Sequence, residues 1–228
     1  MKILIIIPAY NEEKSILNVV NDIKSCGVVC DYLIVNDCST DGTARICEEN
    51  NLNFVSLSNN LGIGGAMQTG YKYAYENGYD VAMQFDGDGQ HIASEIPKVL
   101  NLIEAADIVI GSRYLEKKGF QSSQMRRFGI KFFTFLIKTL TGQKITDPTS
   151  GFRAVYGRVI EIFAKDYPTD YPEPETICLL ARNKFKILET GVVMKERESG
   201  ASSITFIKSI YYMIKVSIAC LFTMGERI

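Results

Sequence analysis

The sequence is short of three things that many enzymes and binding proteins use: histidine, tryptophan and an excess of charge of one sign. Its 228 residues include one histidine, His91, and no tryptophan, and 25 Lys and Arg residues against 26 Asp and Glu residues leave a net charge of −1. A nucleophile activated by histidine would have to use His91, so carboxylates must carry most of the chemistry. Without a concentrated basic surface, nucleic acid is not an expected partner.

Signals for disulfide bonding and for secretion are also missing. The six cysteines form no CxxC pair, and the apolar run at residues 3–7 ends at Pro8, too early for a signal peptide. With 46% hydrophobic and 22% charged residues, the composition is that of an ordinary globular protein. We therefore expect a cytoplasmic chain with reduced thiols, long enough to bury a core without a covalent staple.

Strand-like and helix-like segments alternate through the first half of the chain. The opening run KILIIIP is typical of a strand buried on both faces, and further strands are predicted at 32–36, 54–57, 80–85 and 107–111. Helices are predicted at 12–25, 40–50, 65–77 and 94–105, the last capped by Ser94 with Pro97 early in it. This rhythm predicts an α/β fold with a parallel sheet, in which ligands bind at the carboxyl ends of the strands. After residue 113 the pattern is less regular, with a helix at 128–140, a turn-rich DPTSGF and a strand-like segment at 186–194.

The strongest chemical signal is the segment FDGDGQH at 85–91, directly after a predicted strand. On an extended backbone, side chains two residues apart point the same way, so Asp86 and Asp88 can converge on one ligand. Two carboxylates with Gln90 suit a divalent cation such as Mg²⁺ or Mn²⁺, which typically bridges phosphate oxygens. A lone DxD is more often a polar turn, but its position at a strand end favours a site. An EF-hand loop is excluded because its sixth position requires glycine and here holds His91.

Two further strand ends carry polar residues. PAYNEE (8–13) follows the first predicted strand and VNDCSTDGT (35–43) ends the second. Asp41 is better placed to start a helix, where it accepts hydrogen bonds from free N–H groups. Asp37 precedes any helix start, so we expect it to have no capping role and to accept hydrogen bonds from a base or a ribose.

The glycine-rich segment NNLGIGGAMQTGY at 59–71 matches no standard nucleotide loop. Tyr71 stands where a Walker loop has lysine, and Met67 stands where the dinucleotide fingerprint has its third glycine. We interpret the segment as a tight backbone turn that lines the nucleotide edge of the sheet.

Seven motifs in order give the chain a family resemblance: PAYNE, VNDCSTDGT, NLGIGGAMQTG, DGDGQH, GSRY (111–114), DPTSGFR (147–153) and RESGASS (197–203). Over about residues 2–203 the sequence resembles the family 2 glycosyltransferases with the GT-A fold, and among them the polyprenyl-phosphate sugar transferases. The resemblance implies a mostly parallel central sheet flanked by helices, an inverting transfer reaction and a divalent cofactor.

The resemblance also implies roles for individual positions. In that family, the positions that hold the nucleotide base and the ribose correspond here to Pro8, Tyr10, Glu12, Val35 and Asp37. The segment that holds the sugar-nucleotide and the metal matches Asp86, Gly87 and Asp88, with Gln90 as a further metal ligand. Catalytic positions near the donor diphosphate or the acceptor match Arg113, Asp147 and Arg197, and candidates for the acceptor phosphate are Arg153 and Ser203.

The chemistry of the acceptor decides whether the enzyme needs a general base. A hydroxyl acceptor requires a general base to remove its proton, for which Asp147 is the candidate, with Glu173 or Glu175 as alternatives. A lipid phosphate is already ionised and needs only positioning cations, which Arg113, Arg153 and Arg197 can supply. Relatives that transfer mannose often carry lysine at the position of Ser203, so the sequence favours UDP-glucose or UDP-N-acetylglucosamine over GDP-mannose.

The chain ends on its longest apolar stretch, residues 204–224, which is long enough to span a bilayer. Lys208 and Lys215 lie on one helical face and would be costly in mid-bilayer, whereas an apolar stripe follows the opposite face, as in an in-plane interfacial helix. Lys131 and Lys138 repeat this pattern on the helix at 128–140. We predict a glycosyltransferase domain at 1–203 and an amphipathic membrane-interface helix at 204–228; the alternative is that both helices pack on the sheet or on a partner subunit.

Together these observations predict a metal-dependent, inverting transfer of sugar from a nucleotide donor to polyprenyl phosphate, for cell-envelope glycan synthesis. The enzyme is expected at the cytoplasmic face of the membrane as a peripheral protein, with a small membrane protein or a second copy as a possible partner. Two alternatives share the same sequence features: transfer to a hydroxyl on a glycan or lipid, and a non-catalytic membrane scaffold that binds sugar nucleotides.

Overall fold

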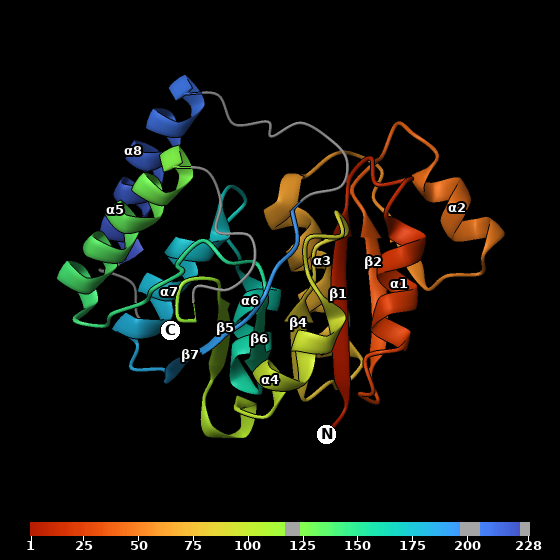
Figure 1. Cartoon of the computed structure of the whole chain (residues 1–228), viewed down its shortest axis with the longest axis horizontal. Coiled ribbons are helices and arrows are strands. Elements are labelled where there is room, and N and C mark those ends of the chain that lie inside the picture. The colour runs from red at the N-terminus through yellow and green to blue at the C-terminus, as the bar shows by residue number, and fades with distance from the viewer. Residues whose placement is uncertain (117–123, 197–205, 224–228) are drawn as a thin grey trace.

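The computed structural model describes residues 1–116, 124–196 and 206–223, which form an open seven-stranded sheet with helices on both faces (Figure 1). The strand order is β3-β2-β1-β4-β6-β5-β7. The strands are β1 (Ile3–Ala9), β2 (Asp31–Asn36), β3 (Phe54–Ser56), β4 (Val81–Gln84), β5 (Ile108–Ser112), β6 (Arg153–Tyr156) and β7 (Ile187–Gly191). The helices are α1 (Ile16–Lys24), α2 (Thr43–Glu49), α3 (Gly62–Glu76), α4 (Ile96–Leu100), α5 (Gln124–Thr141), α6 (Arg158–Lys165), α7 (Pro172–Arg182) and α8 (Phe206–Thr223), with short 3₁₀ turns η1 (Ala93–Glu95) and η2 (Ile103–Ala105).

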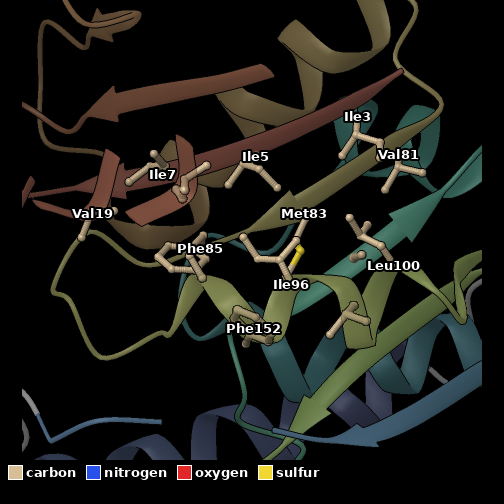
Figure 2. Close-up of a cluster of buried hydrophobic side chains, with 14 of the residues drawn as sticks. Ile3, Ile5, Ile7, Val19, Val81, Met83, Phe85, Ile96, Leu100 and Phe152 are labelled. Atoms are coloured by element: carbon tan, nitrogen blue, oxygen red, sulfur yellow. The ribbon is translucent and has the colours of Figure 1, made fainter. Parts of the chain in front are cut away.

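Strand β1 organises the layers. All seven of its residues are buried, because β2 and β4 pair with it in parallel on either side and a hydrophobic core covers each face of the sheet. Successive side chains point to opposite faces of the sheet, so Ile3, Ile5 and Ile7 enter one core (Figure 2) and Leu4 and Ile6 enter the other. The prediction of a strand buried on both faces is confirmed.

The helices form a layer on each face of the sheet. Helices α1 and α4 pack on the core that Ile5, Met83 and Phe85 share. Helices α3 and α6 cover the opposite face, and α5, α7 and α8 extend that layer on the side of β5 and β7 (Figure 1). The predicted α/β architecture with a mostly parallel sheet is therefore correct.

The structure differs from the sequence prediction at several elements, and helices α6 and α7 are among those that were not predicted. Strand β6 was not expected, and it runs antiparallel to both β4 and β5, between which it lies. The predicted helix at 94–105 is broken into η1, α4 and η2. Ser94 therefore lies within η1 and caps nothing; Glu95 is the N-cap residue of α4, with Pro97 in its first turn.

Helix α8 belongs to the same packed layer as α5 and α7. Its Val216 and Cys220 are buried in the core beside α7, and Tyr212 stacks near Phe133 of α5 with a centroid separation of 5.0 Å. Among the helices of the described ranges, none combines the length and the hydropathy needed to cross a bilayer. The predicted domain boundary at 203/204 lies outside the described residues and stays a prediction.

Helix α3 approaches β1 closely because it lacks a side chain at Gly70. A Cβ atom at Gly70 would lie 2.3 Å from Cγ2 of Ile6, which is fully buried and has no free space to move into. Glycine inside a helix normally costs about 1 kcal/mol relative to alanine. Close packing of α3 on the sheet therefore explains this glycine of the glycine-rich segment.

Replacing Gly70 by alanine is expected to lower the free energy of unfolding by about 1–3 kcal/mol, because the methyl group overpacks the contact between α3 and β1. Urea unfolding followed by circular dichroism measures the change. Gly129 in α5 provides a matched control, since a Cβ atom there meets nothing within 4 Å. Gly129→Ala should be neutral or stabilising by up to about 1 kcal/mol. A Gly70→Ala variant as stable as the parent would contradict this account.

Candidate active site

The carboxyl ends of β2, β1 and β4 bring the predicted nucleotide-binding segments together. Pro8 of β1 lies opposite Val35 of β2. The N–H of Gly87, just after β4, donates to the Pro8 carbonyl at 3.3 Å, and the N–H of Asp37 donates to the Ala9 carbonyl at 2.9 Å. The segments that the sequence analysis assigned to the base and to the metal therefore share one edge of the sheet.

Asp37 has a capping role that the sequence analysis did not expect. Its carboxylate accepts hydrogen bonds from the N–H groups of Leu61 at 2.7 Å and Gly62 at 2.9 Å, where α3 begins. The side chain is buried with the residue only 3% exposed. The prediction that Asp37 caps nothing is wrong, because its capping partners lie more than 20 residues away in the sequence, where no local pattern shows them. The predicted contact of Asp37 with a nucleotide base stays a prediction. Its carboxylate would make that contact in addition to the two hydrogen bonds that it already accepts.

The other predicted nucleotide residues of the first strand end lie close by. Tyr10 is about half exposed, whereas Glu12 is buried and accepts a hydrogen bond from the Ser15 hydroxyl at 2.9 Å. Partial burial alone would raise the pKa of Asp41, but hydrogen bonds from Thr43 and from the Glu13 N–H lower it below its usual value. Asp41 is thus a helix-start residue, as the sequence indicates.

The acidic turn after β4 is held by hydrogen bonds at both of its aspartates. Gln84 Nε2 donates to Asp86 Oδ1 at 2.9 Å, and the N–H of Asp86 donates to Nδ1 of His91 at 2.9 Å. Asp88 Oδ1 accepts from the N–H of Gln90 at 3.0 Å. Both carboxylates remain partly exposed. The turn therefore presents two ordered carboxylates at the sheet edge.

These two carboxylates suit a divalent cation that takes its remaining ligands from substrate and water. Within the described residues, no group of three or more His, Cys, Asp or Glu side chains lies close enough to hold a metal by itself. Mg²⁺ is usually bound by one or two carboxylates together with substrate phosphates. Oxygen donors from Asp86 and Asp88 fit this mode, and both residues are partly exposed at the sheet edge. Metal binding by Asp86, Asp88 and Gln90 stays a prediction; in the structure the Gln90 N–H donates to Asp88.

Gly151 of the DPTSGF turn presses directly against this acidic turn. A Cβ atom at Gly151 would lie 2.5 Å from Gln84 Nε2 and 3.1 and 3.2 Å from the two Asp86 carboxylate oxygens. A side chain at this position would push aside the Gln84 amide, which donates to Asp86, and would crowd the Asp86 carboxylate. The DPTSGF turn therefore packs against the acidic turn, and its fifth position favours glycine.

Arg113 and Asp147 form a buried, two-pronged ion pair beside the acidic turn. Arg113 Nε donates to Asp147 Oδ2 and its Nη2 donates to Oδ1, both at 2.7 Å. Burial alone would lower the pKa of Arg113, but the hydrogen bond and charge of Asp147 reverse this and the net pKa is raised, with Asp86 adding to the effect. The guanidinium thus lies within electrostatic reach of the acidic turn.

Asp147 is the buried ion-pair partner of Arg113. It is fully buried, and its own N–H donates to Glu189 Oε1 at 3.0 Å. Deprotonating an acceptor would require Asp147 to leave Arg113 as an unpaired buried charge. The predicted role of Asp147 as a base is therefore not supported by its position; the residue holds Arg113 in place.

Glu189 was missed by the sequence analysis. It accepts hydrogen bonds from the N–H of Thr146 at 2.8 Å and from that residue's hydroxyl at 3.0 Å, in addition to the bond from Asp147. Burial raises the pKa of Glu189, and the charge of Asp147 adds to the rise. The hydrogen bonds lower the pKa by less, so that it stays above its usual value. The sequence signal that could have pointed to this residue is a glutamate inside the strand-like run KILETGVVM.

Arg153 does not reach an acceptor phosphate. It is fully buried, and its guanidinium donates to the Ser150 carbonyl at 2.6 and 2.8 Å and to the Glu173 carbonyl at 3.2 Å. The sequence suggested Arg153 as a candidate for binding the acceptor phosphate. Because the side chain is buried inside the protein, this assignment is corrected. Arg197 and Ser203 lie outside the described residues. Glu173 and Glu175, the alternative bases, lie in the first turn of α7.

The order of the strands, the acidic turn after β4 and the adjoining Arg113–Asp147 ion pair are the features of a nucleotide-sugar transferase of the GT-A type. The family model for "Glycosyl transferase family 2" matches residues 4–163, so the chain belongs to glycosyltransferase family 2 and is a glycosyltransferase. The predicted family and enzyme class are confirmed.

Curated relatives of similar length carry related names. The chain is 34% identical over 215 residues to a UDP-N-acetylglucosamine–dolichyl-phosphate N-acetylglucosaminyltransferase of Methanococcus voltae, covering 83% of this chain and 84% of the relative. It is 30% identical to an undecaprenyl-phosphate mannosyltransferase of Micrococcus luteus, covering 90% and 88%. Both names describe transfer of a sugar to a polyprenyl phosphate.

A solved structure shares the fold. Glucosyl-3-phosphoglycerate synthase from Mycobacterium tuberculosis, solved with Mn²⁺, UDP and glucosyl-3-phosphoglycerate, superimposes with a TM-score of 0.71 at 17% identity, covering 100% of this chain and 81% of that one. This likeness supports the GT-A fold.

Asp147→Asn is expected to lower the free energy of unfolding by about 3–5 kcal/mol, because it leaves the buried Arg113 without a charged partner. Urea unfolding tests this. Glu161→Gln, which breaks the exposed Glu161–Lys165 pair of α6, is the control and should change stability little. Equal stability of Asp147→Asn and the parent would contradict the structural role. Loss of activity in this variant would not by itself identify a general base.

Proposed function

We propose that this enzyme transfers a sugar from a nucleotide donor to polyprenyl phosphate with inversion, aided by Mg²⁺ or Mn²⁺. The observation that carries the proposal is the juxtaposition of the Asp86–Asp88 turn with the Arg113–Asp147 pair at the carboxyl edge of the sheet. The names of the relatives support polyprenyl phosphate as acceptor. The product would supply cell-envelope glycan synthesis.

The residues divide the work between donor and acceptor. Asp86 and Asp88 would hold the cation, which when bound neutralises the departing diphosphate as a Lewis acid. Arg113, fixed in direction by Asp147, adds positive charge near the same edge. A phosphate acceptor is already ionised and needs no base, which agrees with the burial of Asp147.

For the donor we propose a UDP-sugar, with UDP-N-acetylglucosamine and UDP-glucose as the first candidates. The Methanococcus voltae relative is named for UDP-N-acetylglucosamine, whereas the Micrococcus luteus relative is named for mannose transfer. Ser203, where mannose-transferring relatives often have lysine, favours the UDP-sugars.

The purified enzyme with Mn²⁺, undecaprenyl phosphate and a panel of UDP-N-acetylglucosamine, UDP-glucose and GDP-mannose should yield one glycolipid, detected by mass spectrometry. EDTA should abolish the reaction, and Asp88→Asn should slow it by about 100-fold or more, since a catalytic metal contributes several kcal/mol. Glu104→Gln, an exposed acidic residue in η2, is the control and should react like the parent. Transfer only to hydroxyl acceptors, or nucleotide binding without turnover, would contradict the proposal.

The outer surface of α5 and α8 supports attachment to a membrane. On α5, Phe128, Lys131, Phe135 and Lys138 are exposed and share one face of the helix. On α8, the exposed residues include Tyr211, Ile214, Ile218 and Leu221, which are four of the six residues of the predicted apolar stripe; the other two are Ile204 and Ile207. The two helices lie side by side (Figure 1).

We propose that this surface, defined by the exposed residues of α5 and α8, rests on an anionic lipid bilayer as a peripheral attachment at the cytoplasmic face. Apolar side chains would enter the headgroup boundary, and Lys131 and Lys138 would meet anionic lipids, the combination that in-plane helices use. A polyprenyl phosphate in that bilayer would then lie near the enzyme. A partner protein or a second copy on this surface is an outcome that the next experiment distinguishes.

In flotation with vesicles of phosphatidylcholine and phosphatidylglycerol, the parent protein should bind, and the double variant Phe135→Ser, Ile218→Ser should bind at least about tenfold more weakly. Burying each side chain is worth about 1.5–3 kcal/mol, and 1.4 kcal/mol is tenfold in affinity. Tyr75→Ser, which removes an exposed aromatic side chain from α3, is the control. A parent protein that does not float, or a double variant that floats equally well, would contradict membrane attachment by this surface.

A further inference from the structure

The single histidine of the chain is buried where the acidic turn closes. His91 is 5% exposed, and its ring meets those of Phe85 and Phe152 edge-on, with centroid separations of 5.2 and 4.9 Å. Figure 2 shows these two phenylalanines in the hydrophobic core. Met194, after β7, forms an isolated antiparallel bridge with His91, and the N–H of Lys195 donates to the Gln90 carbonyl at 2.8 Å. The ring is therefore fixed in place by its surroundings.

Both ring nitrogens of His91 face Asp86. Nδ1 accepts the N–H of Asp86 at 2.9 Å, so the proton of the neutral ring is on Nε2. Nε2 lies 3.5 Å from Asp86 Oδ2, an electrostatic contact longer than a good hydrogen bond. Gln84 donates to the other oxygen, Oδ1. Each carboxylate oxygen of Asp86 thus faces a buried donor group.

We propose that His91 is a positioning residue, which fixes the orientation of the Asp86 carboxylate for binding the metal; this deepens and rests on the function proposed above. A ring that only filled the core would need no nitrogen directed at Asp86. Here one side chain binds the backbone of Asp86 and also faces its carboxylate, so backbone and carboxylate are held in one geometry. Partners of this kind behind a metal ligand typically change metal affinity 10–100-fold when removed.

Because there is one histidine, ¹⁵N-histidine labelling gives the NMR signals of His91 alone. At alkaline pH the ring should show the Nε2–H tautomer. Mn²⁺ with UDP should broaden the His91 signals strongly, whereas diamagnetic Mg²⁺ with UDP should not. An Nδ1–H tautomer would overturn the positioning role even if Mn²⁺ binds. A correct tautomer without any broadening would instead contradict the proposed metal site and the positioning role with it.

Three variants separate the two contacts. His91→Asn retains an acceptor near the Nδ1 position, His91→Gln retains a donor near the Nε2 position, and His91→Phe retains only the ring. In an electron paramagnetic resonance titration with UDP present, Mn²⁺ affinity should fall about 10–100-fold in His91→Phe and less in the other two. Ile96→Val is the control, since it perturbs the same core and should lower the melting temperature without changing Mn²⁺ affinity.

Thermal unfolding of each variant distinguishes positioning from general stability. If folded His91→Phe binds Mn²⁺ as tightly as the parent, the positioning role is overturned. If His91→Phe does not fold, His91→Asn and His91→Gln decide: full Mn²⁺ affinity in both overturns the proposal, and a loss in either that exceeds the effect of Ile96→Val supports it.

Discussion

The ion pair between Arg113 and Asp147 is the interaction on which the site depends. It connects the end of β5 to the DPTSGF turn, with both partners buried. That turn places Gly151 against the Asp86 carboxylate and leads directly into β6. A buried charge without its partner is strongly unfavourable, so the turn is fixed relative to β5. The pair therefore helps to hold Gly151 against the acidic turn and the start of β6 beside β5.

Most polar side chains at the carboxyl edge of the sheet interact with the protein itself. Asp37 binds the start of α3, Glu189 binds the turn before Asp147, and Arg153 binds backbone carbonyls. The carboxylates of Asp86 and Asp88 also accept hydrogen bonds from the protein, but they stay partly exposed. The set of groups that can face a substrate is therefore small, and the many remaining polar groups serve to hold it rigid.

The sequence allowed the strands from β1 to β5, the acidic turn and the family to be predicted, because each leaves a local pattern: a β-branched run, a DxD spacing or a motif. Strand β6 leaves none, since its four residues follow a turn and gain their strand character only by pairing with β4 and β5. The contacts of Asp37, Asp147 and Arg153 could not be predicted for the same reason. Their partners Leu61, Arg113 and Glu173 lie 20 to 34 residues away, so that only the folded chain shows which charges are already paired.

The place of β6 also sets an order of events during synthesis. Among the described strands, β5 pairs only with β6 and β7, both of which follow it in the chain. Strands β1 to β4 can pair with one another as they leave the ribosome, which extends the chain by about 5–20 residues per second. Strand β5 has to wait until Tyr156 has emerged. For some seconds the nascent chain therefore exposes an apolar strand, Ile108–Ser112, before either of its native partner strands has been made.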